Sequence, residues 1–281
     1  MIDLHVHTIY SDGEYTPKQI LDKCKQRGIT TVAITDHNAM EGSKRALFEN
    51  DYPDITVISG VELSAVYPVR GANLHILGYN FNLQDKCLND VTNSIMQDNV
   101  ARLKSLVDLF VKHYNFSFRD EDLEKVYASV GNIGKPDIAR LCVSYGYAKT
   151  VREVFDNYIN PIEDKMKKRS TLLTDRDCID YIKNAGGIAC LAHPIELKKS
   201  IAELKTYIKT LMSYGLEAVE VYQSKHSKKY SQQLLEFVNE FGLVYSVGSD
   251  YHGPLVSPDA DLGFGNNHNL QIETASILSR F

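Results

Sequence analysis

Two histidines near the N-terminus have the spacing of a metal site at the end of a strand. His5 and His7 lie in the run Ile2–Thr8, in which apolar and polar residues alternate as in a strand with one apolar face. Side chains two residues apart in a strand point the same way and lie about 7 Å apart along the chain. One cation can therefore bind both imidazoles, although two chance histidines on a strand would give the same pattern.

Further histidines and carboxylates stand at other apolar runs that read as strands. These runs cover residues 31–35, 55–61, 74–79, 188–192 and 244–247. Together with Asp12, the polar residues at the expected strand ends form a set of six histidines and three carboxylates, namely His5, His7, Asp12, His37, Glu62, His75, His193, Asp250 and His252.

This mixture of imidazole and carboxylate suits zinc, manganese or iron, and nine ligands are too many for one ion. Two or more ions can activate a water, polarise a phosphoryl group and stabilise the leaving oxygen. We therefore expect hydrolysis of a phosphoester, which needs no nucleophilic side chain. Hydrolysis of an amide or a lactone on the same ions is the alternative at this stage.

Helical patterns alternate with the expected strands. They cover residues 17–28, 43–49, 174–186, 201–214 and 230–241. The alternation predicts parallel strands with a site at their C-terminal ends, and about seven strands are enough for a barrel. An open doubly wound sheet is disfavoured because no G-x-G-x-x-G follows the first strand. After Gly253 we expect a loop and a short terminal helix.

The alternation stops between Leu83 and Tyr158, where all patterns are helical. We therefore expect a barrel formed by residues 1–82 and 171–281, with a helical insertion of residues 83–170.

Composition limits the location and the partners. The chain has 281 residues, 43% of them hydrophobic, and a net charge of −5. No apolar run approaches the roughly 20 residues that span a bilayer, so we expect a cytoplasmic protein without a membrane partner. The five cysteines form no C-x-x-C pair, which argues against a zinc knuckle or a disulfide framework. The negative charge argues against a surface for duplex DNA but allows a small acidic substrate bound to metals. The oligomeric state is not predicted.

Several segments carry a resemblance to a known family. They are Asp3–Thr8, Ser11–Gly13, Thr35–His37, Gly60–Glu62, Leu74–Gly78, Ala192–Pro194 and Gly248–Gly253. In this order they resemble the motifs of the PHP (polymerase and histidinol phosphatase) superfamily over nearly the whole chain. The resemblance implies an α/β fold, a distorted (β/α)₇ TIM-like barrel, with two or three divalent ions, manganese first and iron or zinc as alternatives.

The resemblance also implies the ligand sets. One ion would be bound by His5, His7, Glu62 and Asp250, a second by Glu62, His75 and His193, and a third by Asp12, His37 and His252. No ligand position is missing, which argues against a non-catalytic member such as the PHP domains kept as structural parts of some polymerases. A binding or scaffold role is therefore the weaker reading.

The chain is more similar to the stand-alone phosphoesterases that hydrolyse nucleoside 3′,5′-bisphosphates or trim RNA from its 5′ end. This similarity lies in Ile138–Arg140, Gly146–Lys149, Val154–Phe155 and Glu217–Tyr222. It implies a nucleotide or a short RNA as substrate, hydrolysed by in-line attack of a metal-bridging hydroxide. A histidinol-phosphate phosphatase, or another small-molecule phosphatase on the same ions, is the alternative.

The candidate substrate contacts depart from the pattern of these relatives. Where they tend to carry Gly-Arg-x-His, this chain has Gly134–Asp137, and a lysine offers phosphate a point charge instead of two parallel hydrogen bonds. Lys135, Arg140 and Arg169 are candidate phosphate contacts, each of which also reads as ordinary surface charge.

Two histidines are candidates for a catalytic role. We count His193 among the catalytic residues because it is an expected metal ligand. His226 follows an expected strand and could contact the substrate or donate a proton to the leaving group. Asp3 and Asp36 are expected to support the site without binding an ion.

Overall fold

The computed structural model describes residues 1–69, 71–128, 131 and 133–281. The chain divides into two compact units. The first combines Met1–Thr92 with Leu173–Phe281, and the second is Asn93–Leu172. All nine residues of the predicted metal set belong to the first unit. Within the described ranges, no helix combines the length and the apolar composition needed to cross a membrane.

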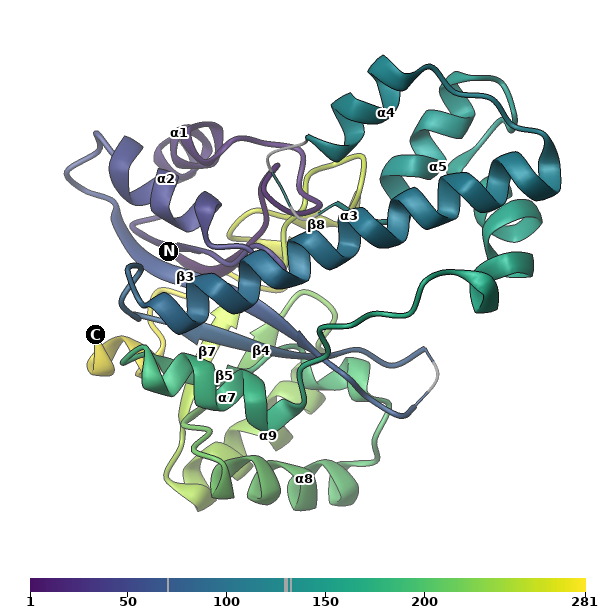
Figure 1. The fold of residues 1–281 in the computed structure, drawn as a ribbon. Helices are drawn as coiled ribbons and strands as arrows, with labels where there is room; N and C mark the ends of the chain where they lie inside the picture. The colour runs from purple at the N-terminus through teal and green to yellow at the C-terminus, as the bar shows by residue number, and fades with distance from the viewer. Residues whose placement is uncertain (70, 129–130, 132) are drawn as a thin grey trace. The chain divides into compact units, whose positions relative to one another are not determined.

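A sheet of seven strands in sequential order forms the centre of the first unit (Figure 1). The strands are β1 (Ile2–Val6), β2 (Thr31–Ile34), β3 (Thr56–Ala65), β4 (Leu74–Tyr79), β5 (Ile188–Leu191), β6 (Ala218–Gln223) and β7 (Val244–Gly248). Past the end of β7, the Asp250 N–H donates to the His5 carbonyl at 2.9 Å, and the His7 N–H donates to the Tyr251 carbonyl at 2.9 Å. The sheet is thus nearly closed, and the predicted α/β barrel class is confirmed.

The expectation that all strands are parallel is wrong for β4. This strand pairs antiparallel with both β3 and β5, whereas the other neighbours in the sheet are parallel. Only residues 66–73 join β3 to β4, and a crossover between parallel strands needs a dozen residues or more. The start of β4 therefore lies at the same edge of the sheet as the C-terminal ends of the parallel strands, which is where His75 is needed.

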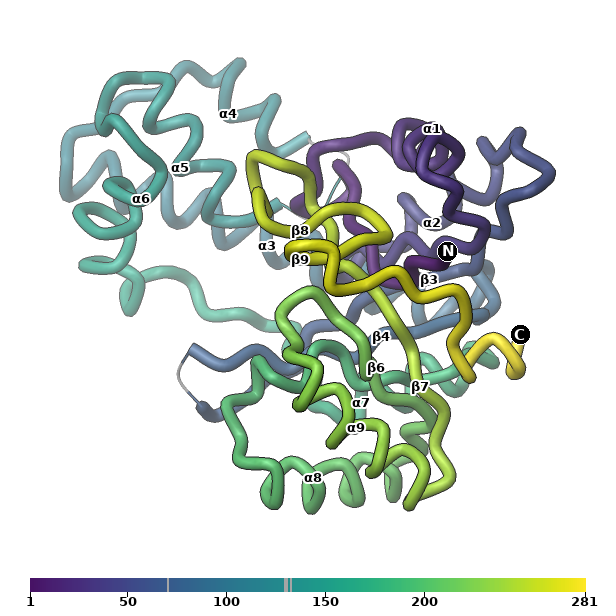
Figure 2. Tube along the Cα trace, turned by 180° about the vertical axis from the view of Figure 1, so that it is seen from behind, coloured from purple at the N-terminus to yellow at the C-terminus, as the bar shows by residue number. Residues whose placement is uncertain are grey.

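Helices α1, α2, α7, α8 and α9 belong to this unit (Figures 1 and 2). Their bounds are Pro17–Arg27, Glu41–Glu49, Asp175–Asn184, Ile201–Ser213 and Lys228–Phe241. Helix α2 lies beside β2 and β3, α7 beside β3, β4 and β5, and α9 beside β6 and β7, while α1 packs against α2. Helix α1 shows why the first and last residues of a helix could be predicted from the sequence. The Thr16 side chain accepts from the Gln19 N–H, Pro17 is the first helical residue, and Gly28 ends the helix at φ 69°.

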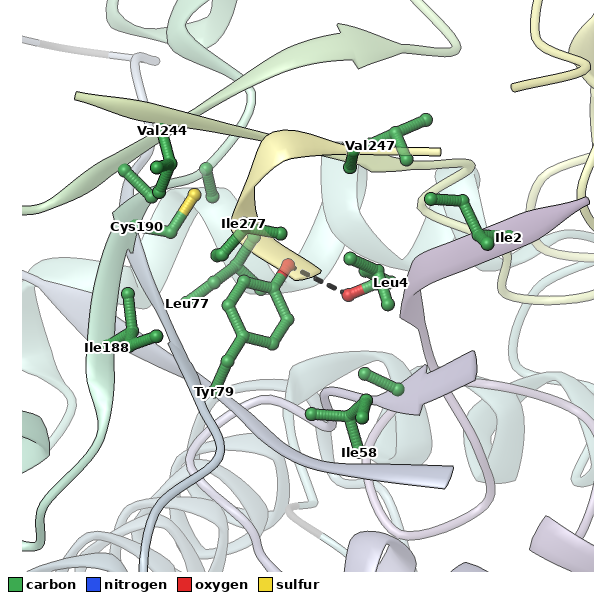
Figure 3. Packing of buried hydrophobic residues seen from close by; sticks show 14 of the residues in the cluster. Ile2, Leu4, Ile58, Leu77, Tyr79, Ile188, Cys190, Val244, Val247 and Ile277 are labelled. Atoms are coloured by element: carbon green, nitrogen blue, oxygen red, sulfur yellow. Dashed lines mark hydrogen bonds between the residues drawn. The ribbon is translucent and has the colours of Figure 1, made fainter. Parts of the chain in front are cut away.

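Apolar side chains from all parts of the barrel fill its interior (Figure 3). Tyr79 lies among them, and its hydroxyl donates to the Leu4 carbonyl at 2.8 Å. Ile2 and Leu4 belong to this interior, but Val6 packs in a separate cluster with Ile20 and Val32. The strict alternation expected for the first strand is broken because the register of β1 against β2 shifts between Asp3 and Val6.

The segment after Gly253 contains two short paired strands, β8 (Ala260–Asp261) and β9 (Gly265–Asn266), before a terminal 3-10 turn at Ser276–Arg280. The predicted short terminal helix is present, whereas the pairing of β8 with β9 was not expected.

The second unit has a hydrophobic core of its own, in which Leu106, Phe110 and Ile138 are fully buried. Its helices are α3 (Lys86–Tyr114), which begins in the first unit, α4 (Asp120–Tyr127), α5 (Lys135–Ser144) and α6 (Val151–Val154). A π-helical turn follows at Phe155–Ile159 and a 3-10 turn at Asn160–Lys165. Among its described residues the unit contains no strand, in agreement with the helical patterns of the sequence.

Candidate metal centre

Glu62 is the central residue of the predicted set. It lies within β3, is 0% exposed, and five imidazole nitrogens approach its two oxygens. Oε2 lies 3.3 Å from His5 Nε2, 3.2 Å from His7 Nε2 and 2.9 Å from His37 Nδ1, and Oε1 lies 2.9 Å from both His75 Nδ1 and His193 Nε2. Glu62 therefore contacts histidines from several strand ends at once.

The other two carboxylates extend the cluster. Asp250 Oδ1 lies 3.4 Å from His7 Nε2 and 3.6 Å from His252 Nδ1. Asp12, whose side chain is 47% exposed, lies 3.3 Å from His252 Nε2 and 3.8 Å from His37 Nε2. The structure thus brings all nine predicted residues together.

Four overlapping groups within this cluster have ligand atoms that all lie within 4.8 Å of one another. The groups are His7, Asp12, His37 and His252; His5, His7 and Asp250; His5, Glu62 and His193; and His37, Glu62 and His75. The set can therefore hold more than one metal ion.

Several buried atoms of the cluster lie close to one another but have no hydrogen-bond partner among the described residues. They are His5 Nε2, His7 Nε2, His37 Nδ1, Glu62 Oε2 and His193 Nδ1. A buried polar atom without a partner costs free energy. Because these atoms are imidazole nitrogens and a carboxylate oxygen, the residues present fit divalent ions.

Charge in the cluster is balanced between imidazoles and carboxylates. Burial alone would lower the pKa of His5, but the nearby Glu220, Glu62 and Asp250 outweigh it and raise that pKa well above its usual value. Burial also acts to lower the pKa of His7, but the nearby carboxylates of Asp250 and Glu62 outweigh it and raise that pKa to about 10. Burial acts to raise the pKa of Glu62, yet the surrounding histidines hold it well below its ordinary range. Divalent ions would replace the imidazole protons and keep this compensation.

Asp3 and Asp36 hold the loops that carry two of the acidic residues, as expected. Asp36 accepts from the Thr8 N–H, the Thr8 hydroxyl and the Ser11 hydroxyl, each at 2.7 Å. Asp3 accepts from the Ser249 N–H at 2.9 Å and from its hydroxyl at 2.6 Å. These bonds fix the segment that leads to Asp12 and the backbone next to Asp250.

Glu220 is a supporting residue that the sequence analysis missed. It is 0% exposed on β6. Its Oε1 lies 2.9 Å from His5 Nδ1, and its Oε2 accepts from the backbone N–H of His193 at 2.7 Å. The second bond holds His193 at φ 22°, a conformation that residues other than glycine rarely adopt. The available signal was a lone charge between Val219 and Val221 in an apolar strand.

A second missed group lies at the rim of the cluster. Lys225 Nζ lies 3.9 Å from Asp250 Oδ2 and pairs with Glu196, while Gln223 Nε2 donates to Asp250 Oδ2 at 3.3 Å. His226, which the sequence analysis did name as a candidate, is 5% exposed, and its Nδ1 contacts the Val221 carbonyl at 2.9 Å. Its Nε2 is buried and has no partner among the residues that the structure describes.

The three candidate phosphate contacts lie in the second unit. Lys135 pairs with Glu163, Arg140 lies 3.4 Å from Asp137, and Arg169 is exposed. Asp137 accepts from the Gly134 N–H at 2.7 Å at the start of α5. The aspartate that replaces histidine in this motif thus caps a helix, and the phosphate-binding role of the three cations stays a prediction.

Known proteins are similar to this chain in sequence. The PHP domain family matches residues 3–173. A 5′-3′ exoribonuclease from Haemophilus influenzae is 28% identical over 253 residues, which are 90% of this chain and 90% of that protein. A 3′,5′-nucleoside bisphosphate phosphatase from Chromobacterium violaceum is 25% identical over 253 residues, 90% of this chain and 87% of that protein.

A solved structure agrees on the fold. A protein from Bifidobacterium adolescentis, assigned as a metal-dependent phosphoesterase, gives a TM-score of 0.75 over 94% of this chain and 91% of its own, at 23% identity. The family match covers more than half of the chain and confirms the resemblance that the motifs indicate. The chain belongs to the PHP domain family.

Proposed function

We propose that the chain is a metal-dependent phosphoesterase that hydrolyses phosphate monoesters of nucleotides, such as nucleoside 3′,5′-bisphosphates, or short oligonucleotides. The observation that carries this proposal is the convergence of six histidines and two aspartates with Glu62, together with buried ligand atoms that lack hydrogen-bond partners among the described residues. The names of the two relatives, an RNA exonuclease and a nucleotide phosphatase, support the substrate class.

We assign the nine residues to two or three divalent ions, manganese first and iron or zinc as alternatives. The ligand sets are His5, His7, Glu62 and Asp250; Glu62, His75 and His193; and Asp12, His37 and His252. When bound, such ions lower the pKa of a coordinated water and polarise the phosphoryl oxygens. A cytoplasmic location stays a prediction.

The protein's own groups orient the ligands and supply charge. Glu220 keeps a proton on His5 Nδ1, so that Nε2 presents its lone pair toward Glu62 and Asp250. Burial acts to lower the pKa of Lys225, but Glu196 outweighs it and the pKa is raised, so Lys225 carries a positive charge at the rim. That charge can attract the anionic substrate.

His226 fits a substrate contact better than a proton donor. Its Nδ1–H donates to the Val221 carbonyl, which leaves a lone pair on Nε2. Burial lowers the pKa of His226, so the imidazole is neutral near pH 7. In this state Nε2 accepts a hydrogen bond and has no proton to give to a leaving group.

The test is phosphate release from adenosine 3′,5′-bisphosphate by the Mn²⁺-loaded protein, with a protein stripped by EDTA as control. We expect release only with the metal. His7→Ala and Asp250→Ala should each abolish turnover and leave the circular dichroism spectrum unchanged. Full activity in both variants would contradict the assigned ligands.

A panel with L-histidinol phosphate and p-nitrophenyl phosphate separates the alternative small-molecule phosphatase. Preference for histidinol phosphate over the nucleotide would overturn the substrate class and leave the reaction type intact.

A further inference from the structure

Lys225 lies in the wall of a cavity of about 210 Å³ within the first unit. Asp250, one of the nine residues of the proposed metal centre, lines the same cavity. The volume is below the roughly 300–1,000 Å³ of sites for drug-sized molecules, so it suits a group as small as a phosphoryl group. Among the described residues of this wall, Lys225 is the one cation, and Asp259 is a second, exposed carboxylate. A phosphoryl group beside Asp250 would therefore meet a single positively charged side chain.

The backbone that carries Lys225 is fixed beside Asp250. The Lys225 N–H donates to Gln223 Oε1 at 2.7 Å, and Gln223 Nε2 donates to Asp250 Oδ2 at 3.3 Å. The Ser224 hydroxyl donates to the carbonyl of Ser249, the residue before Asp250. Gln223, Ser224 and Ser249 are buried. Buried hydrogen bonds thus set the position of Lys225 relative to Asp250.

Glu196 holds the side chain of Lys225. Its Oε1 accepts a hydrogen bond from Lys225 Nζ, and its Oε2 accepts one from Asn73 Nδ2 at 3.0 Å. The side chain of Glu196 is 19% exposed and that of Lys225 is 52% exposed, so a ligand can reach the ammonium. Of the three donors of an ammonium, the described residues take one, because Asp250 Oδ2 lies 3.9 Å from Nζ, beyond hydrogen-bond range. Lys225 can therefore donate to a phosphoryl oxygen while Glu196 still holds it.

The net charge of the phosphoryl group decides how strongly Lys225 attracts it. A phosphate monoester carries close to two negative charges above its second pKa of about 6. A phosphodiester has no second ionisable oxygen and carries one negative charge. Because the Coulomb energy is proportional to both charges, a cation attracts the dianion about twice as strongly as the monoanion at the same distance. Metal ions distinguish the two charges as well, so the contribution of Lys225 is measured by removing it.

We propose that Lys225 contacts the phosphoryl oxygens of the substrate and makes the protein select phosphate monoesters over phosphodiesters, with Glu196 as its positioning residue. The proposal rests on the proposed phosphoesterase function, because that function places the phosphoryl group beside Asp250. Within that function, it favours nucleotides with a terminal phosphate over the internal linkages of an oligonucleotide.

The first test compares two esters with the same leaving group. p-Nitrophenyl phosphate is a dianionic monoester at about pH 8, bis(p-nitrophenyl) phosphate is a monoanionic diester, and both release p-nitrophenol. Lys225→Met keeps an unbranched side chain and removes the charge. We expect it to lower kcat/KM about a hundredfold for the monoester and about tenfold for the diester. Equal losses for the two esters, or no loss, would overturn the proposal.

Two further variants separate the contact from the general charge of the surface. Lys225→Arg keeps the positive charge, and its ratio of the two kcat/KM values should stay closer to the wild type than to Lys225→Met. Lys229→Met is the matched control, because it removes an exposed lysine at the start of α9, outside the cavity wall. It should leave both values unchanged. A change of the ratio as large as that in Lys225→Met would contradict a specific contact.

The role of Glu196 is tested by combining variants. Glu196 Oε2 also lies 3.9 Å from His193 Nδ1, which gives it a second route to the metal centre. If Glu196 acts through Lys225, Glu196→Gln lowers the preference for the monoester in the wild type and has no further effect in Lys225→Met. An additional loss in the double variant would assign Glu196 to His193 and overturn its positioning role.

The last test does not depend on hydrolysis. Calorimetry at about pH 8 measures the binding of inorganic phosphate, a dianion, and of dimethyl phosphate, a monoanion, to the Mn²⁺-loaded protein. We expect Lys225→Met to weaken phosphate binding about tenfold and dimethyl phosphate binding clearly less. Equal weakening, or no phosphate binding to the wild type, would refute the role of Lys225 even if the esters are cleaved. Selective weakening for phosphate in a protein that cleaves neither ester would support the role of Lys225 and overturn the proposed function.

Discussion

Replacing Glu220 by glutamine should weaken ion binding at the proposed metal centre by about ten- to a hundredfold. Each oxygen of the Glu220 carboxylate accepts one hydrogen bond. Oε1 lies 2.9 Å from His5 Nδ1, and Oε2 lies 2.7 Å from the backbone nitrogen of His193. Glutamine keeps one acceptor and replaces the other by an NH₂ donor. The His193 N–H can only donate, so the glutamine oxygen stays there and the NH₂ group faces His5. His5 then carries its proton on Nε2, the nitrogen that faces Glu62 and Asp250.

The expected size follows from burial. Glu220 and His5 are both 0% exposed, so water cannot replace the lost bond. A buried donor or acceptor left without a partner costs about 1–3 kcal/mol. A ten- to hundredfold loss of affinity corresponds to about 1.4–2.8 kcal/mol, so the two ranges agree. The effect should concern the ion bound by His5 and spare the one bound by Asp12, His37 and His252.

Competition with a chromophoric chelator measures the affinities of the sites for Mn²⁺ or Zn²⁺. Long-range ¹H–¹⁵N spectra of the zinc-loaded protein report which nitrogen of His5 carries the proton. Glu217→Gln is the matched control, because Glu217 lies three residues away and pairs only at the surface, with Lys183. An exposed pair contributes about 1 kcal/mol or less. Wild-type affinity together with an unchanged His5 tautomer in Glu220→Gln would refute the reasoning.

Three further predictions concern packing, pH and metal removal. Gly248→Ala should destabilise the first unit by about 1–3 kcal/mol and weaken ion binding, since its Cβ would lie 2.2 Å from the His5 Cβ; denaturant unfolding and the metal titration check this. Burial acts to raise the pKa of Asp98, but bonds from Ser170 and Thr171 outweigh it and hold that pKa below its ordinary 3.8. The stabilisation of the fold by ionised Asp98 is therefore complete above pH 3.8 and is lost as the pH falls through the lowered pKa. Asp98→Asn should accordingly cost about 1–2 kcal/mol at pH 7 and much less once the pH has fallen below the lowered pKa. Equal costs at neutral and at acidic pH would contradict the assignment. Mn²⁺ at a hundred times its Kd should stabilise the protein by about 2.7 kcal/mol against unfolding, an effect that EDTA reverses in thermal melts and that Asp250→Ala removes.

The convergence of the nine candidate ligands was predictable from the sequence because each of them stands at the end of an apolar run or within a short motif. Such residues converge whenever the strands share an edge, so the strand order need not be known. The direction of β4 was not predictable in this way, because His75 reads as a strand residue in either direction. The eight residues of 66–73 are too few for a crossover, but the strand expected from the sequence ended at residue 61, and the twelve residues then left before residue 74 did not reveal the reversal.

The roles of Glu220 and Lys225 could not be predicted from the sequence for a different reason. Their roles depend on which distant residues the fold places beside them, as when Glu220 meets His5, 215 positions away. A single buried charge in an apolar strand indicates that a partner exists, but the pattern does not say which one. Helix ends such as Thr16 and Gly28 were predictable because their hydrogen bonds are local.

The pairing of β1 with the residues that follow β7 affects how the protein is made. The first barrel strand leaves the ribosome early, but its closing partner, Tyr251, comes 245 residues after Val6. Contacts this distant in sequence form late in folding. The ligands are divided in the same way, with His5 at one end and His252 at the other. The proposed ligand set of His5, His7, Glu62 and Asp250 is thus complete only once Asp250 has been made, and a chain that stops before Val244 would expose an unpaired edge of β1 that favours aggregation.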